Sequence, residues 1–152
     1  MNKDLMIFRY FCAILFVSVL FSCATFPPKP SQSEYLDVDY RRFISGVYVD
    51  ELANKYVKLD CRFSSIFAGT LPGGYSPTRY MSFLAISPEG FRIESPGHLT
   101  IVVPKDIADI VFTLRHGQSI KVYGLAVPII IRTVGGRVYK SLIIEMDLIE
   151  KQ

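Results

Sequence analysis

The segment PKDIADIVFTLRHGQSIKVYGLAV, residues 104–127, changes its apolar period in the middle. Its first half has large aliphatic residues at the i, i+3, i+4, i+7 spacing of one helix face, namely Ile107, Ile110, Val111 and Leu114. Pro104 suits a first helical position, and Gly117 can close the helix. From residue 118 onward the pattern is that of a strand. We therefore predict a helix over 104–116 that leads directly into a strand.

Segments on either side of this helix alternate between apolar and polar residues, as half-buried strands do. In the clearest of them one face carries Val57, Leu59, Cys61 and Phe63. Further strands are predicted at 79–87, 99–103 and 138–150. The segment 91–95 is expected to continue a hairpin, and 128–137 is expected to form a loop or ribbon. Four residues of the last strand are expected to point inward: Leu142, Ile144, Met146 and Leu148.

The predicted order is three strands or strand pairs, one helix and two further strands. An antiparallel sheet with a single helix between its third and fourth strands resembles the OB fold, a five-stranded barrel. The resemblance covers residues 47–150, where NKYVKLDCRF (54–63) is similar to a first strand of that fold and GQSIKVYGLAV (117–127) to a fourth. It implies one mainly β domain, which we place at 39–152. A different small β-barrel or a β-sandwich with one helix agrees with the same order.

The N-terminal sequence has the order of a bacterial secretory signal: a charged stretch, MNKDLMIFR, precedes an apolar stretch at 10–22. The four residues LFSC, 20–23, resemble a lipobox. That resemblance implies removal of residues 1–22 and attachment of a diacylglycerol to the Cys23 thiol. The Pro- and Ser-rich residues 23–38 would then form a spacer. An uncleaved transmembrane anchor and an ordinary secretory signal are the alternatives.

A lipobox predicts where the protein resides. Acyl chains such as palmitate on Cys23 would hold it at a membrane of the bacterial cell envelope, facing the periplasm or the surface. Acylation would leave Cys61 as the one thiol of the processed chain, so we expect no intramolecular disulfide. Cys61 is expected to be a small buried apolar residue.

Catalytic and cofactor motifs find little support in the sequence. The two histidines, His98 and His116, fall in a turn and at the end of the predicted helix. No nucleophile elbow surrounds a serine, and the His and Cys residues are too few and scattered for a structural zinc site. Without the two cations and one acid of residues 1–22, the chain carries 15 Lys and Arg against 13 Asp and Glu. We expect no enzyme, no cofactor and no metal, and nucleic acid is an unlikely partner at this charge balance.

Aromatic and basic residues are the better lead to function. Ligands of OB folds meet the face of strands two and three and the loops that join strands one to two and four to five. By resemblance, these regions contain seven candidate ligand-binding residues: Tyr75, Arg79, Tyr80, Phe91, Arg92, Arg132 and Arg137. Rings beside guanidinium groups suit single-stranded nucleic acid, sugars, peptides and protein surfaces. The same residues also fit the ordinary surface and core of a barrel.

Together these features favour a membrane-anchored envelope lipoprotein that acts as a non-catalytic binding module for an envelope protein or glycan. One alternative is a single-stranded nucleic-acid-binding protein, which the export signal and the near-neutral charge disfavour. A further alternative is an enzyme whose site has no recognisable motif, because a fold alone does not determine a ligand.

Overall fold

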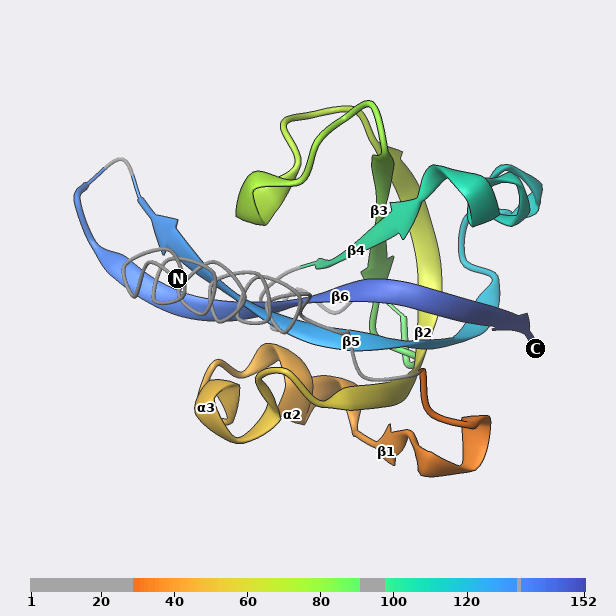
Figure 1. Ribbon diagram of the computed structural model, residues 1–152, viewed down its shortest axis with the longest axis horizontal. Helices are drawn as coiled ribbons and strands as arrows, with labels where there is room; N and C mark the ends of the chain where they lie inside the picture. Colours follow the sequence, from red (N-terminus) through yellow and green to blue (C-terminus); the bar gives the residue numbers. More distant parts are fainter. Residues whose placement is uncertain (1–28, 91–97, 134) are drawn as a thin grey trace, which may run out of the picture.

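The computed structural model describes residues 29–90, 98–133 and 135–152. Its main elements are five long β-strands (Figure 1). They are β2 (Tyr56–Phe67), β3 (Tyr80–Ile86), β4 (Leu99–Pro104), β5 (Ser119–Arg132) and β6 (Val138–Lys151). The shorter elements are β1 (Leu36–Asp37), helices α2 (Tyr40–Ile44) and α3 (Val49–Leu52), and 3₁₀ helices η1 (Gln32–Glu34), η2 (Pro72–Gly74) and η3 (Lys105–Thr113). None of the helices in these ranges has the length and apolar character needed to cross a membrane.

The strands close into a barrel with the strand order of the OB fold. The pairs β2–β3, β3–β4 and β5–β6 are antiparallel, and β2 also pairs antiparallel with β5, which closes the barrel. β4 and β6 pair in parallel, through Ile101 with Ile144 and Val102 with Glu145. The predicted OB fold is confirmed, whereas the expectation of a wholly antiparallel barrel is wrong for this pairing. Parallel neighbours need a crossover connection, which η3 and β5 supply.

One hydrophobic core fills the barrel and explains the alternation in β2. Val57, Leu59 and Cys61 point into it and are each at most 1% exposed, as predicted. All residues of this core cluster lie between positions 38 and 149. Residues 29–152 therefore contain the complete core of the described structure.

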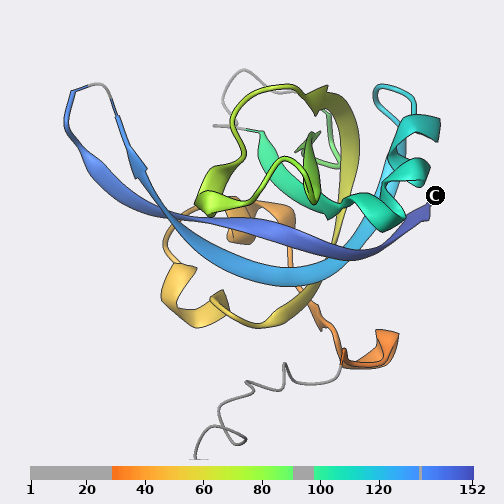
Figure 2. The same cartoon turned by 45° about the horizontal axis from the view of Figure 1, so that its top comes forward.

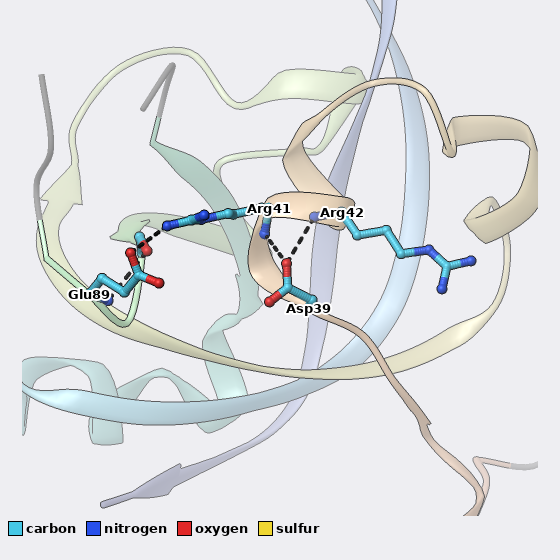
Figure 3. A network of polar contacts seen from close by, with 5 residues as sticks. Asp39, Arg41, Arg42 and Glu89 are labelled. Carbon is cyan, nitrogen blue, oxygen red and sulfur yellow. Dashed lines mark hydrogen bonds and ion pairs between the residues drawn. The ribbon is translucent and has the colours of Figure 1, made fainter. Parts of the chain in front are cut away.

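Two short helices, α2 and α3, pack against the barrel ahead of β2. The Asp39 carboxylate begins α2 by accepting hydrogen bonds from the backbone N–H groups of Arg41 (2.9 Å) and Arg42 (3.2 Å) (Figure 3). The Arg41 guanidinium then extends to the Glu89 carboxylate in the turn after β3, at 2.5 Å. This ion pair is exposed, so we expect it to contribute little to stability. The cap and the buried residues of both helices fix the segment that leads into β2.

The folded domain begins before the predicted boundary at residue 39. Tyr35 is buried, and its ring packs edge-on against Tyr56 and Tyr123 with centroid distances of 5.6 and 5.4 Å. β1 pairs in parallel with β2. The C-terminal end of the predicted spacer, 23–38, is therefore part of the barrel domain.

The connection between β4 and β5 is a 3₁₀ helix, not the α-helix that the sequence spacing predicts. η3 runs from Lys105 to Thr113, so the predicted range 104–116 is too long at both ends. Because a 3₁₀ helix has three residues per turn, buried side chains recur at every third position: Ala108, Val111 and Leu114. Ile107 and Ile110 are only partly buried.

β6 contains a β-bulge at Asp147, which reverses the alternation of the strand. Two successive residues of β5 pair with Leu148 and Met146, so Asp147 between them has no partner in the register. Beyond the bulge Leu148 is 37% exposed and Ile149 is 5% exposed. The predicted inward position of Leu148 is therefore wrong. The other three predicted inward residues are confirmed: Leu142, Ile144 and Met146.

β5 and β6 continue beyond the other strands as a two-stranded ribbon that projects from the barrel (Figures 1 and 2). The range 128–137, predicted as a loop or ribbon, is thus mostly part of this long hairpin. At its end the Thr133 N–H donates to the Arg137 carbonyl at 2.9 Å. Gly136 has a φ of +78°, a conformation that favours glycine and tightens the turn. We call residues 128–133 and 135–140 the arm.

Candidate ligand-binding site

An open depression of about 570 Å³ lies beside the loop that joins β2 to β3. Its lining comes from this loop, from the start of β3 and from β5: Gly73, Gly74, Tyr75, Ser76, Thr78, Arg79, Tyr80 and Val127. Gly73 and Gly74 have φ values of +66° and +77°, which other residues rarely adopt. The glycine pair therefore lets the chain turn sharply in η2, so that Tyr75 and Tyr80 come to lie side by side.

Tyr75 and Tyr80 share one carboxylate, that of Glu145 in β6. The Tyr75 hydroxyl donates to Glu145 Oε2 at 2.6 Å, and the Tyr80 hydroxyl donates to Oε1 at 3.4 Å. The two rings meet edge to face, with centroids 4.8 Å apart and planes at 75°, a favourable aromatic geometry. Each of the three side chains thus restrains the other two.

The environment keeps both phenols protonated. Burial raises the pKa of Tyr75 above its usual value, and the hydrogen bond to the Glu145 carboxylate raises it further. The pKa of Tyr80 is also raised, first by burial and then by the negative charge of Glu145. Because both hydroxyls remain donors at neutral pH, the pair presents aromatic ring surface to the depression and no phenolate.

Arg79 supplies the positive charge in the lining. Its backbone is fixed on both sides, because its N–H donates to Ser76 O at 3.1 Å and its carbonyl accepts from the Lys105 N–H at 2.9 Å. The side chain is exposed, and no acidic side chain in the described part of the chain forms an ion pair with it. A guanidinium has five N–H donors, so Arg79 can orient a ligand that is rich in acceptors.

The structure brings three of the seven predicted residues together at this depression, Tyr75, Arg79 and Tyr80. Phe91 and Arg92 lie outside the residues that the structure describes. The part that any of these residues plays in binding remains a prediction.

Arg132 and Arg137 lie apart from the depression, at the far end of the arm. The arm meets η2 at Ile129, whose Cγ2 would lie 3.3 Å from a Cβ placed on Gly73. Arg132 follows three residues later in β5, which is about 10 Å at the rise of an extended strand. The two loops thus border different surfaces, and the arm arginines extend beyond the tyrosine pair.

Three residues of the site, Glu145, Ser76 and Thr78, were not among the predicted ones. Glu145 alternates with the predicted inward residues of the last strand, and its tyrosine partners precede it by 70 and 65 positions. Ser76 and Thr78 lie in the loop itself, where their hydroxyl oxygens are 2.8 Å apart. The available signal for this pair was two hydroxyl residues within four positions of the Gly73-Gly74 pair.

Within the described ranges no three His, Cys, Asp or Glu side chains group closely enough to hold a metal ion. Cys61 is a free and buried thiol, as predicted. Burial raises the pKa of this thiol, so it stays protonated and behaves as a small apolar side chain. His116 lies beyond η3, where its Nδ1 is 2.8 Å from the backbone oxygen of Ser64. It therefore links the connection before β5 to β2.

No protein family model matches the chain, and no curated protein matches it either. Two crystal structures of Rim1, a mitochondrial single-stranded DNA binding protein from S. cerevisiae, are 16% and 19% identical to it, with TM-scores of 0.46 and 0.45. Each match covers 64% of this chain and 94% of Rim1. A protein from Leishmania major Friedlin that is named as an aspartyl-tRNA synthetase is 10% identical, with a TM-score of 0.49, over 82% of this chain and 22% of that protein. At these identities the neighbours do not indicate which ligand this chain binds, so the ligand class has to be inferred from the residues of the depression.

Proposed function

We propose that the chain is a non-catalytic binding module whose ligand contacts the depression beside Tyr75, Arg79 and Tyr80. The observation that carries this proposal is the tyrosine pair held on Glu145 by hydrogen bonds of 2.6 and 3.4 Å. The rings are oriented before a ligand arrives, so binding costs little side-chain entropy.

A polar and largely uncharged ligand, such as a glycan of the cell envelope, suits the lining best. Tyrosine rings can pack against the C–H surface of a sugar, while the hydroxyls of Ser76 and Thr78 and the Arg79 guanidinium can hydrogen-bond to its hydroxyl groups. A polyanion suits it less well, because Arg79 is the one cation among the lining residues and Glu145 lies close by. Phosphate polymers draw their affinity from several cations. A segment of an envelope protein is the second candidate.

We also propose that the protein is a bacterial envelope lipoprotein anchored through an acylated Cys23. The support is the LFSC sequence at 20–23 after an uncharged apolar stretch; these residues lie outside the described structure. Metabolic labelling with a fatty acid, followed by mass spectrometry of the N-terminal peptide, should find the label on Cys23. Label that persists in Cys23→Ser would exclude this anchor.

An NMR titration of residues 29–152 with N-acetylglucosamine oligomers tests the ligand class. We expect the amide shifts to concentrate around Tyr75 and Tyr80 and to disappear in Tyr80→Ala. Phe112→Ala is the matched control, because Phe112 is an exposed ring on η3 (64%) outside the depression. Shifts that survive in Tyr80→Ala would mean that the ligand binds elsewhere.

A parallel titration with a labelled oligothymidylate across a salt series distinguishes the alternatives. Tight binding with a steep salt slope would replace the glycan with single-stranded nucleic acid. If neither probe binds, a pull-down from solubilised envelope with the wild type and Tyr80→Ala tests the protein candidate. A protein retained by the wild type and lost in the variant would identify that class.

A further inference from the structure

The arm carries a concentration of exposed apolar side chains. Ile130 is 70% exposed, Val138 is 60% exposed and Tyr139 is 49% exposed. A single exposed apolar residue needs no explanation, but several gathered in one hairpin are unusual, and concentrated apolar surface marks interaction sites. Because the arm projects from the barrel (Figures 1 and 2), the folded domain leaves these side chains in solvent.

These apolar side chains lie on both faces of the arm. Directly opposed residues of an antiparallel pair point to the same side, and successive residues alternate. The register therefore places Ile130 and Val138 on one face, and Ile131 with its partner Tyr139 on the other. A partner that lay flat against the arm would cover one face only. Apolar side chains on both faces, beside Arg132 and Lys140 on the first, suit a partner that surrounds the end of the arm better than one that covers a single face.

All the charges of the arm are positive. Residues 128–142 include Arg132, Arg137 and Lys140 and contain no Asp or Glu. Lys140 Nζ lies 2.8 Å from Asp50 Oδ1 of α3, so its charge is partly balanced. Arg132 and Arg137 form no ion pair with an acidic side chain among the described residues. The end of the arm thus combines two unpaired cations with apolar surface on both sides.

We propose that the arm docks the domain onto an anionic phospholipid bilayer by inserting its end into the interface. Apolar side chains on both faces would enter the boundary between headgroups and acyl chains. The guanidinium groups of Arg132 and Arg137 would bind lipid phosphates in bidentate fashion. Tyr139 has the amphipathic ring that is enriched at membrane interfaces. This surface depends neither on the depression at Tyr75 nor on acylation of Cys23.

The dimensions of the arm agree with interfacial insertion. From Ile129, which contacts η2, the strand continues for three residues to Arg132, or about 10 Å. Amphipathic elements at a membrane surface typically bury their apolar side chains about 5–10 Å into the headgroup and acyl boundary. The arm can therefore reach this depth while the barrel remains in water.

Vesicle flotation with residues 29–152, which contain the complete core of the described structure, tests the proposal. We expect binding to vesicles of phosphatidylcholine with about a third phosphatidylglycerol, and much weaker binding to phosphatidylcholine alone. Each cation near an anionic surface strengthens binding about fivefold, so Arg132→Gln/Arg137→Gln should weaken it about 30-fold. Ile130→Ser/Val138→Ser should also abolish most of the binding. Phe112→Ser, at an equally exposed ring on η3, is the control that should bind like the wild type.

A fluorescent reporter locates the contact, because the chain has no tryptophan. Tyr139→Trp places one at the arm, and Phe112→Trp places one on η3 at the other end of the molecule (Figure 1). When anionic vesicles are added, we expect the tryptophan emission of Tyr139→Trp to shift to the blue and to be quenched by brominated lipid. The emission of Phe112→Trp should not change.

Three results would overturn the proposal: no flotation with anionic vesicles, equal flotation of the arm variants and the wild type, or an unshifted Tyr139→Trp spectrum. If Arg132→Gln/Arg137→Gln instead lost binding to an oligothymidylate while vesicles bound none of the proteins, the arm would be assigned to nucleic acid. Circular dichroism of every variant shows whether the barrel has folded, so that loss of binding is not loss of structure.

Discussion

Gly124→Ala should test how closely β5 and β6 pack at the point where the barrel supports the tyrosine site. Gly124 lies in β5 beside the bulge of β6. A Cβ at this position would lie 2.2 Å from the carbonyl oxygen of Glu145 and 2.6 Å from Ile144 Cγ2. The nearer of these atoms belongs to the backbone of a central strand, so a rotamer change cannot relieve the contact.

The size of the effect follows from the distance. An ordinary contact between carbon and oxygen is more than 3 Å, so the backbone at Glu145 would have to move by about 1 Å. Overpacking a rigid interior costs about 1–3 kcal/mol, and a clash with backbone belongs at the upper end of that range. We expect a loss of about 3 kcal/mol, or about 10 °C in Tm for a domain of this size. Because Glu145 also holds both tyrosines, ligand affinity at the depression should fall as well.

Urea unfolding and thermal melts of residues 29–152 measure this loss. Gly135→Ala is the matched control, because a Cβ there meets no atom within 4 Å and its φ is not positive. We expect the control to stay within about 0.5 kcal/mol of the wild type. A Gly124→Ala protein as stable as this control would show that β5 and β6 are further apart at Gly124 than the structure places them.

Three further predictions concern the barrel. Val111→Asp should cost about 3 kcal/mol or more and Ile110→Asp about 1 kcal/mol, because the 3₁₀ helix buries the former and leaves the latter partly exposed; equal losses in urea unfolding would favour an α-helical η3. Leu148→Ser should cost about 1 kcal/mol and Ile149→Ser about 3 kcal/mol, because the bulge leaves only the latter fully buried; equal losses would indicate that the bulge is absent. Burial raises the pKa of Tyr40 to about 12. The neutral phenol therefore stabilises the fold fully below pH 10, which is about its pKa in the unfolded chain, and this stabilisation is lost as the pH rises toward 12. Tyr40→Phe should therefore lose less stability between pH 9 and 12 than the wild type does. If the free energy of unfolding fell equally with pH in both proteins, the raised pKa of Tyr40 would be wrong.

The sequence predicts the strands of the barrel well, because half-buried strands leave a two-residue period that can be read locally. Val57, Leu59 and Cys61 show this period in β2, and all three are buried. The exceptions have local causes that composition does not reveal. The bulge at Asp147 inverts the period of β6 over its last residues. The apolar spacing in 107–114 is compatible with an α-helix, but the segment packs against β3 and β4 as a 3₁₀ helix, with Ala108 and Val111 buried.

The candidate site could be predicted only in part, because its key contact joins residues far apart in the chain. Tyr75 and Tyr80 were expected through the position of their loop in an OB fold. Their anchor, Glu145, is 65 or more residues away, and its place depends on the parallel pairing of β4 with β6. Arg132 and Arg137 lie away from Tyr75 and Tyr80 for a related reason: the β5–β6 hairpin is long enough to carry them past the depression.

The separation of these two surfaces gives a final prediction, which keeps the two proposals distinguishable. Val127 lines the depression, and Arg132 lies five residues further along β5, which is about 16 Å at strand rise. Sites more than about 10 Å apart that share no partner usually contribute independently. Tyr80→Ala should therefore leave vesicle flotation unchanged, and Arg132→Gln/Arg137→Gln should leave the titration with N-acetylglucosamine oligomers unchanged. The double variant should lose both activities by the amounts seen in the single variants. Loss of both activities in either variant alone would mean that one ligand spans the depression and the arm, and that the two proposals describe a single site.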